Sequence, residues 1–223
     1  MKKITFFALV VLSTFVNLSA QTNSTSGSSG NNGSFYVQYN PMTYKIDYSG
    51  ADDQNFNGFT IGYNHTVASF EGSNLSLEVG GALLYSRWSD SEEHEKFDED
   101  VSVNLWALKV PASLVYDWKV SDAVSIKPYA GLNLRFNISA KEKWEATSEY
   151  DMYNEKDDVN LMDKKDMGSK DDTWGRVQFG WHIGANVEFN KSWFLGVSYG
   201  SDITEVCKKC KFSTVSITLG MKL

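Results

Sequence analysis

The chain is poor in the residues from which most catalytic and metal sites are built. Its 223 residues include only 3 histidines and 2 cysteines. A structural zinc site needs about four ligands, and the sequence offers none close to Cys207 and Cys210, so we predict no metal site and no cofactor. His65, His94 and His182 stand in no motif that pairs them with a serine, so we expect no enzymatic activity.

A surplus of positive charge is also missing, as is a long apolar segment after the N-terminus. The chain has 28 acidic against 21 basic residues, a net charge of -7 and a pI of about 5.0. This balance argues against a nucleic-acid partner. No segment beyond the N-terminal one approaches the roughly 20 apolar residues of a membrane helix, so we predict no transmembrane helix.

The N-terminus follows the order of a secretory signal peptide. Two lysines precede an apolar stretch and a small-residue end at Ala20, so we predict a signal peptide over residues 1–20. The apolar stretch is too short for a retained membrane helix, and no cysteine follows it that could carry a lipid anchor. Residues 21–34 are rich in Ser, Asn, Gly and Thr and are predicted to form a flexible linker. The main domain is then expected over residues 35–223.

The two cysteines form a CxxC pair, with two lysines between them, in a polar segment. A redox motif of this kind draws its reactivity from a helix N-terminus, and no helix is indicated here. For an exported chain we therefore predict a local disulfide between Cys207 and Cys210.

Strict alternation of apolar and polar residues dominates the chain and is clearest over residues 176–189. There Val177, Phe179, Trp181 and every second residue onward to Phe189 are apolar, while polar residues or glycines stand between them. This period of two predicts a strand with one apolar face. Comparable segments start near Phe35, Phe59, Leu75, Trp106, Ile126, Trp193 and Thr214. We therefore expect about eight strands, the smallest number known for outer-membrane barrels.

The connections between these strands alternate between short and long. The short ones are residues 70–74, 119–123 and 190–192, and the long polar ones are residues 47–57, 90–100, 141–172 and the segment with the cysteines. Transmembrane barrels show this asymmetry, with short periplasmic turns and long exterior loops. Residues 90–100 are strongly acidic, which predicts a solvated or cation-binding loop. Residues 141–172 show no period, which predicts a long functional or mobile loop.

The apolar faces could turn outward to lipid or inward to the core of a lipocalin-like soluble barrel. Glycines recur on the polar faces, where a narrow interior needs small residues, and aromatic residues gather near the ends of the apolar rows. We therefore predict an all-β fold, an eight-stranded antiparallel up-and-down transmembrane β-barrel, with the lipocalin-like barrel as the alternative.

The hairpin from Lys109-Val110-Pro111 through Leu114-Val115-Tyr116 to Lys127-Pro128-Tyr129-Ala130-Gly131 resembles that of porin-like outer-membrane protein β-barrel domain families. The layout after the linker is similar to small barrels of the OmpX and OmpA type. This resemblance implies a barrel in the bacterial outer membrane, inserted by the barrel-assembly machinery. The chain departs from the pattern at Leu223, where such barrels often end in phenylalanine. Pro111 lies within a predicted strand, where we expect a local bulge.

An outward apolar face places a set of charged side chains inside the barrel. These are Glu78, Lys109, Asp117, Lys127, Arg135, His182 and Glu188. Isolated charges are costly in a narrow interior, so we expect them to pair. Our hypothesis is a carboxylate–cation network of Glu78, Glu188, Lys109 and Arg135 that stabilises the barrel and blocks flow through it.

We predict a non-enzymatic outer-membrane barrel with a plugged polar lumen and a structural or surface-interaction role carried by its exterior loops. The alternative is a small gated porin-like channel, and an outer-membrane lipid-modifying enzyme or a soluble lipocalin-like binding barrel are further alternatives. The expected partners are outer-membrane lipid and lipopolysaccharide, and an extracellular protein or surface ligand. We expect no nucleic acid partner, and a monomer.

Overall fold

The computed structural model describes residues 33–48, 50–94, 97–148 and 155–223. The predicted signal peptide and all but the last residues of the predicted linker lie outside the described residues. The first strand, β1 (Gly33–Ile46), begins inside the range predicted for the linker. No helix in the described part of the chain is long and apolar enough to cross a membrane.

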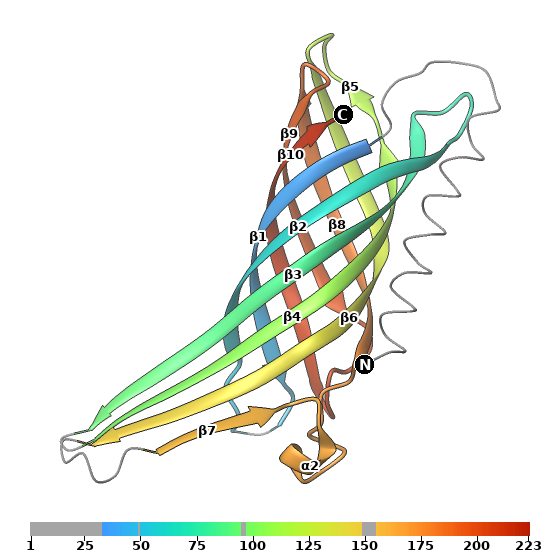
Figure 1. Ribbon diagram of the computed structural model, residues 1–223. Coiled ribbons are helices and arrows are strands. Elements are labelled where there is room, and N and C mark those ends of the chain that lie inside the picture. Colours follow the sequence, from blue (N-terminus) through green and yellow to red (C-terminus); the bar gives the residue numbers. More distant parts are fainter. Residues whose placement is uncertain (1–32, 49, 95–96, 149–154) are drawn as a thin grey trace.

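Eight long strands form a closed antiparallel ring (Figure 1). After β1 they are β2 (Gln54–Ser69), β3 (Leu75–His94), β4 (Phe97–Tyr116), β6 (Val124–Ser148), β8 (Val177–Phe189), β9 (Trp193–Asp202) and β10 (Cys210–Lys222). Each long strand pairs with the next along the chain, and β1 closes the ring by pairing with β10. Two short strands, β5 (Trp118–Lys119) and β7 (Glu155–Asn160), pair with β6, and α2 (Lys164–Met167) follows β7. This confirms the predicted eight-stranded up-and-down barrel.

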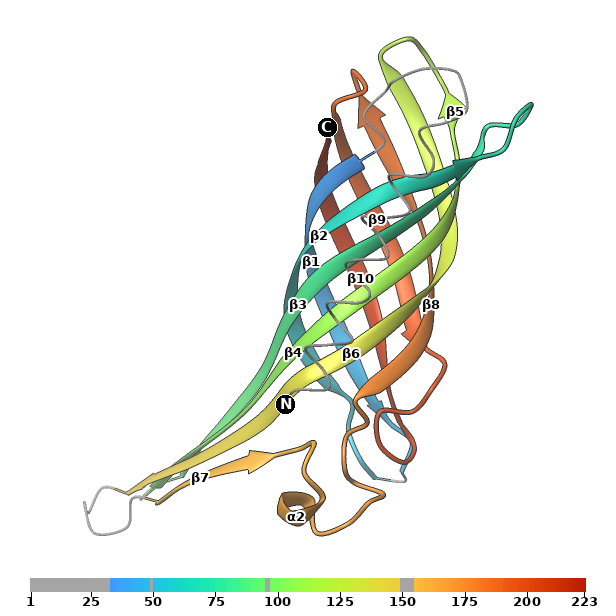
Figure 2. The same ribbon diagram turned by 45° about the vertical axis from the view of Figure 1, so that its right-hand side comes forward.

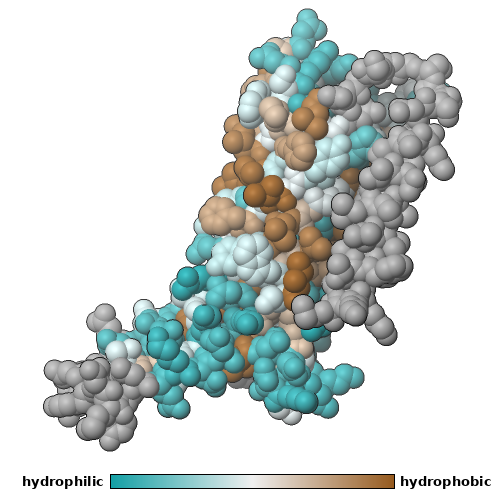
Figure 3. Space-filling model, in the orientation of Figure 1, coloured by the Kyte–Doolittle hydropathy of each residue, from teal (hydrophilic) through white to brown (hydrophobic). Residues whose placement is uncertain are grey.

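The apolar rows face outward. Ile61 is 67% exposed on β2, whereas its neighbour Thr60, which points inward, is 1% exposed. The space-filling view shows hydrophobic residues over the barrel wall and hydrophilic ones gathered toward both ends (Figure 3). Since apolar side chains in this number face lipid and not water in a stable barrel, the orientation agrees with the predicted transmembrane barrel and not with the lipocalin-like alternative.

The two ends of the barrel differ, as predicted. The short connections around residues 70–74, 117–123 and 190–192 lie at one end, which we call the turn end. Both ends of the described chain lie there too, because the Leu223 amide donates to the Gly33 carbonyl over 3.0 Å. The opposite end, which carries the long connections, is called the loop end.

The acidic segment 90–100 was predicted as a loop, and this prediction is wrong. β3 and β4 continue through it to His94 and Phe97, and β6 continues beside β4 as far as Ser148. With β7 they form a four-stranded extension sheet that projects obliquely from the loop end (Figures 1 and 2). Alternation is lost there because both faces of these strands lie outside the membrane, and a register shift between Trp106 and Ala107 further obscures the period.

The interior at the loop end holds an apolar core that the sequence analysis did not predict. Inward-facing Met42, Phe56, Leu105 and Phe212 are each at most 2% exposed. They pack with Tyr44, Leu84, Val103, Ala107, Ala140, Leu161, Met162, Trp174, Val206 and Cys210. The barrel interior is therefore not polar throughout, because its loop end is filled like the core of a soluble protein.

Residues 161–175, which we call the lid segment, close this core from outside. The lid segment contributes Leu161, Met162 and Trp174 to the core, so part of the predicted long loop 141–172 is packed structure. Its backbone is bonded to the β9–β10 connection, where the Gly175 amide donates to the Val206 carbonyl over 2.6 Å. Lys208 adds an exposed ion pair to Asp171, with 2.6 Å between Nζ and Oδ2.

Pro111 produces a smaller irregularity than the predicted bulge. β3 and β4 are paired at Val79–Ala112 and again, in the same register, at Ala82–Lys109. The residues between these two pairs are not paired across the two strands. Toward β6, Pro111 stands opposite Asn133 in regular register. Since proline lacks a backbone donor, the ladder is interrupted without inserting a residue.

We predict that Trp174→Ala destabilises the folded barrel, because it empties the centre of the aromatic core at the loop end. The expected loss in the free energy of unfolding is about 3–5 kcal/mol, the usual cost of removing a buried aromatic ring. Urea unfolding in detergent micelles measures it, with Ile203→Ala, an exposed residue at the same end, as control. Equal stability of the two variants would contradict the structural role of the lid segment.

Candidate functional site

The interior begins at the turn end with a layer of ion pairs. Glu188 Oε2 lies 2.7 Å from Lys127 Nζ and 2.9 Å from Lys222 Nζ, and Lys127 lies 3.7 Å from Asp117. Glu188 is 5% exposed, so two lysines compensate one buried carboxylate. Lys222 was missing from the predicted network, although its place in the polar row of β10 was a signal that could have included it.

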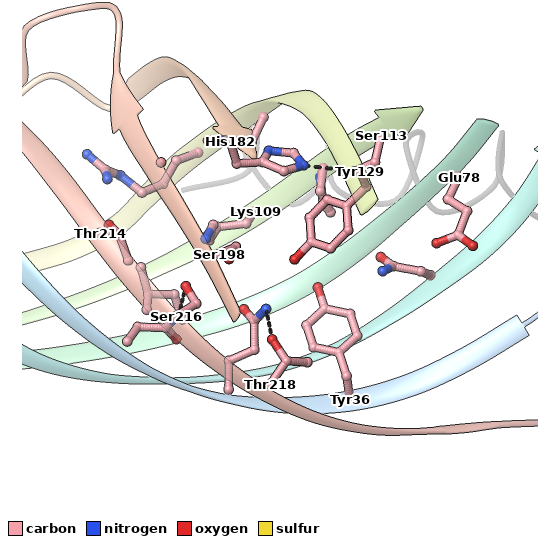
Figure 4. A pocket seen from close by; sticks show the side chains of 18 of the residues that line it. Tyr36, Glu78, Lys109, Ser113, Tyr129, His182, Ser198, Thr214, Ser216 and Thr218 are labelled. Atoms are coloured by element: carbon pink, nitrogen blue, oxygen red, sulfur yellow. Dashed lines mark hydrogen bonds between the residues drawn. The ribbon is translucent and has the colours of Figure 1, made fainter. Parts of the chain in front are cut away.

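A polar cavity of about 100 Å³ lies in the middle of the interior. Ser113 and His182 line it and are hydrogen-bonded, with 2.8 Å between Oγ and Nε2. Glu78 and Lys109 stand on opposite sides of it, with the rings of Tyr36 and Tyr129 between them (Figure 4). Glu78 and Lys109 were both assigned to the predicted network, but neither forms an ion pair with any described residue.

Toward the loop end, the cavity is bordered by a buried polar network and by Met42 and Leu84 of the apolar core. Arg135 Nη2 lies 2.7 Å from Asp202 Oδ2, and Arg135 Nε donates to Asn137 Oδ1 over 3.2 Å. Asn137 in turn donates to Gln178 Oε1 over 2.7 Å. The Arg135 guanidinium also lies 5.0 Å from the ring centre of Phe212, which belongs to the core. Arg135 was predicted as an interior cation, whereas its partner Asp202 was not identified.

The interior charges balance. The cations are Lys109, Lys127, Arg135 and Lys222, and the carboxylates are Glu78, Asp117, Glu188 and Asp202. Of the four residues named in the predicted network, Glu188 and Arg135 do form buried ion pairs, but with other partners than each other. The partners differ because the two residues lie in different layers along the barrel axis, and each pairs within its own layer.

The Ser113–His182 pair was not expected, because no sequence motif joins the two residues. They come from β4 and β8, which flank β6, and they meet over Gly131, with which both are paired. A serine activated by histidine is a nucleophile in many hydrolases. The cavity that the pair lines lies between the ion-pair layer and the Arg135 network. In this structure the pair is a hydrogen bond between two interior side chains.

The predicted disulfide is not present. Cys207 and Cys210 are free thiols, although their backbones are bonded across a tight turn over 3.0 Å. Cys210 is 4% exposed in the apolar core, and Cys207 Sγ lies 3.0 Å from the hydroxyl of Tyr44. Burial raises the pKa of the Cys207 thiol to about 12. The thiolate is the reactive form of cysteine, so this environment does not favour redox chemistry at the pair.

Among the described residues, no cluster of three or more His, Cys, Asp or Glu side chains is arranged to hold a metal ion. The acidic residues of the former loop 90–100 are instead distributed over both faces of the extension sheet, because alternate residues of a strand point in opposite directions. The side chains of residues 93–97 lie outside what the structure describes.

Comparison with known proteins identifies the family. The sequence matches the profile described as outer membrane protein beta-barrel domain over residues 7–222. The chain belongs to the outer membrane protein beta-barrel domain family. This confirms the resemblance carried by the central hairpin, and it places this outer-membrane barrel in the bacterial outer membrane. By the usual arrangement of such barrels, the turn end faces the periplasm and the loop end faces outward.

Solved structures with a similar fold are outer-membrane barrels. The attachment invasion locus protein Ail of Yersinia pestis is 17% identical, with 86% of this chain and 97% of that chain covered and a TM-score of 0.41. Neisserial surface protein A is 13% identical, with 86% and 97% covered and a TM-score of 0.43. The outer membrane enzyme PagL is 13% identical, with 85% and 99% covered and a TM-score of 0.48. No curated protein matches the sequence.

We predict that Asp202→Asn destabilises this outer-membrane barrel strongly, because it leaves the buried Arg135 guanidinium without a counter-charge. Removing one partner of a buried ion pair costs about 3–5 kcal/mol. Urea unfolding in micelles measures the loss, and Lys208→Gln, which breaks an exposed pair at the same end, serves as control and is expected to change little. A mild effect of Asp202→Asn would mean that water reaches Arg135 and that this layer does not seal the interior.

Proposed function

We propose that the protein is a non-enzymatic outer-membrane barrel with a closed interior that binds partners at the cell surface through its extension sheet. The observation that carries this proposal is the sheet itself. Three barrel strands continue beyond the barrel at the loop end and gain a fourth strand, β7. A rigid β-barrel that extends its own strands outward presents a fixed binding surface where a flexible loop would not.

The interior supports a closed barrel. The ion-pair layer, the Arg135 network and the apolar core follow one another along the axis, and the lid segment covers the last of them. The alternative of a gated channel rests on Glu78 and Lys109. Both line the cavity without an ion pair, so an open state could offer them new partners. An ion could cross the apolar core only by giving up its hydration shell, with no polar groups there to replace it. The apolar core therefore favours the closed barrel.

The extension sheet has two strand edges to which a further strand can be added. β3 pairs with β2 only up to Arg87, opposite Asn57, so residues 88–94 are paired to β4 alone. On the other side, β7 is paired to β6 alone. Backbone groups along such edges accept an additional extended segment, which is a common mode of peptide recognition.

The charge of the extension sheet indicates the kind of partner. Its acidic residues include Asp90, Glu92, Asp98, Glu99, Asp100, Glu142, Glu145, Glu155, Asp157 and Asp158, against Lys141, Lys143 and Lys156. A second copy would be repelled by this charge, whereas an extended basic segment of an extracellular protein would be attracted. The proposal therefore includes a monomer, with barrel-assembly machinery as its partner during insertion and outer-membrane lipid around its apolar wall.

The proposal is tested by shortening the β3–β4 hairpin. Residues 89–102 are replaced by an Asn-Gly turn that joins Trp88 to its partner Val103. The variant is expected to remain a compact, heat-modifiable species, because the barrel lies below the cut. Its binding to an immobilised peptide of alternating Lys and Thr is expected to fall by about tenfold or more, equivalent to about 1.4 kcal/mol.

A matched variant separates charge from strand edge. Asp98→Asn with Asp100→Asn keeps the hairpin and removes charge, so it is expected to weaken binding less than the shortened hairpin does. An alternating Glu and Thr peptide should not bind the wild-type barrel. Equal binding of the basic peptide by wild type and shortened variant would sink the proposed role of the extension sheet.

A further inference from the structure

The outward face of β3, β4 and β6 changes character in regular steps beyond the membrane. Tyr85 and Trp106 are paired in register, their ring centres lie 4.8 Å apart, and Trp106 is 42% exposed. The previous outward pair, Leu83 with Leu108, is apolar. Aromatic residues at this boundary mark the level of the lipid headgroups. The Tyr85–Trp106 pair therefore places the outer surface of the membrane on this face.

The next two rows on the same face carry positive charge. Arg87, Asn104 and Lys141 stand side by side in register, and Ser89, Ser102 and Lys143 form the row after them. Successive outward rows are two residues apart, which is about 7 Å along a strand. These cations therefore lie within about 14 Å of the aromatic pair, at the depth of lipid headgroups and the sugars attached to them.

The cations of these rows are free to bind a ligand. Arg87, Lys141 and Lys143 are exposed, and none of them forms an ion pair with a described residue. Negative charge returns only in the following row, where Ser91, Asp100 and Glu145 are in register. Anions are thus attracted to the base of the extension sheet and repelled from its outer part, which faces water.

The same face is hollowed. A depression of about 550 Å³ lies over the three strands, and Arg87, Lys143, the polar residues Ser89, Ser91, Ser102 and Asn104, and Val101 line it. Three carboxylates also line it: Asp100 and Glu145 belong to the outer row, and Asp90 alternates with the outward residues Ser89 and Ser91. Hydroxyl and amide groups form its floor, and the Asn104 amide oxygen is held in place by the Tyr85 hydroxyl over 2.9 Å. The volume is in the range of small-ligand sites, and the lining suits sugar hydroxyls together with phosphate.

We propose that this depression binds the phosphorylated sugar headgroup of a glycolipid in the outer leaflet. Arg87 and Lys143 in the lining contact the phosphates, Lys141 adds positive charge beside Asn104, and Ser89, Ser102 and Asn104 donate to the sugar hydroxyls. The site deepens the proposed function, because it rests on the loop end facing outward. Its face differs from the strand edges proposed for protein partners, so the two binding activities are separable by mutation.

Native mass spectrometry of the refolded full chain in a non-ionic detergent tests the proposal. The probes are a bisphosphorylated disaccharide lipid and its phosphate-free counterpart. The triple variant Arg87→Gln, Lys141→Gln, Lys143→Gln is expected to bind the bisphosphorylated lipid about tenfold more weakly than wild type, a difference of about 1.4 kcal/mol. Wild type should show a similar preference for the bisphosphorylated lipid over the phosphate-free one.

The control variant is Lys164→Gln, Lys165→Gln, Lys170→Gln, which removes the same charge from exposed lysines in and after α2, away from this face. It should bind within about twofold of wild type. Equal weakening of both triple variants would reduce the effect to net charge and overturn the site, as would equal binding of the phosphate-free lipid. Full displacement by inorganic phosphate would assign the site to free phosphate. Binding of the peptide of alternating Lys and Thr is measured separately. It tests the proposed role of the extension sheet, whichever result the lipid experiment gives.

Discussion

Closure of the eight-stranded ring is the constraint on which the other features of this protein depend. β1 pairs with β10 from Ser34–Lys222 to Ile46–Cys210, so no barrel strand has a free edge within the membrane. In lipid every backbone polar group must find its partner within the protein, and only a closed barrel achieves this with strands. A ring of eight leaves an interior just wide enough for side chains. Each inward residue therefore has to fit its neighbours in volume and in charge.

The interior meets this demand by a different means at each level. Near the turn end, Gly62 and Gly220 leave room for the rings of Tyr36 and Phe194, which lie against them, so that two large side chains fill a narrow section. The charged groups are compensated within single layers, as at Glu188 and Arg135. At the loop end, where the strands diverge toward the extension sheet, apolar residues and the lid segment fill the wider space.

Much of the fold could be predicted because alternation with period two is a local property. Val177 to Phe189 shows both its strand and its lipid-facing row in the sequence alone, and the short turns follow from the same pattern. The continuation of β3, β4 and β6 beyond the membrane could not be found in this way, since neither face of these segments meets lipid. The location of the protein in the outer membrane was indicated by the Lys109 to Gly131 hairpin, which resembles that of outer-membrane barrel families.

The interior partners could be predicted only in part. An inward charge is evident from its place in a strand, but its partner depends on the stagger of strands around the ring, which brings Arg135 of β6 to Asp202 of β9. Met42 and Phe56 occupy inward positions that pattern alone assigns to polar residues, because the change from a polar to an apolar interior occurs within one strand. The Ser113–His182 contact likewise depends on strand register, because both residues are paired with Gly131 of β6.

The closed interior is tested most directly by electrical recording of the refolded wild-type protein in a planar lipid bilayer. With the ion-pair layer, the Arg135 network and the apolar core in series, we expect no steady conductance above that of the bare bilayer. A large and steady conductance under the same conditions would contradict the closed barrel and would favour the gated channel.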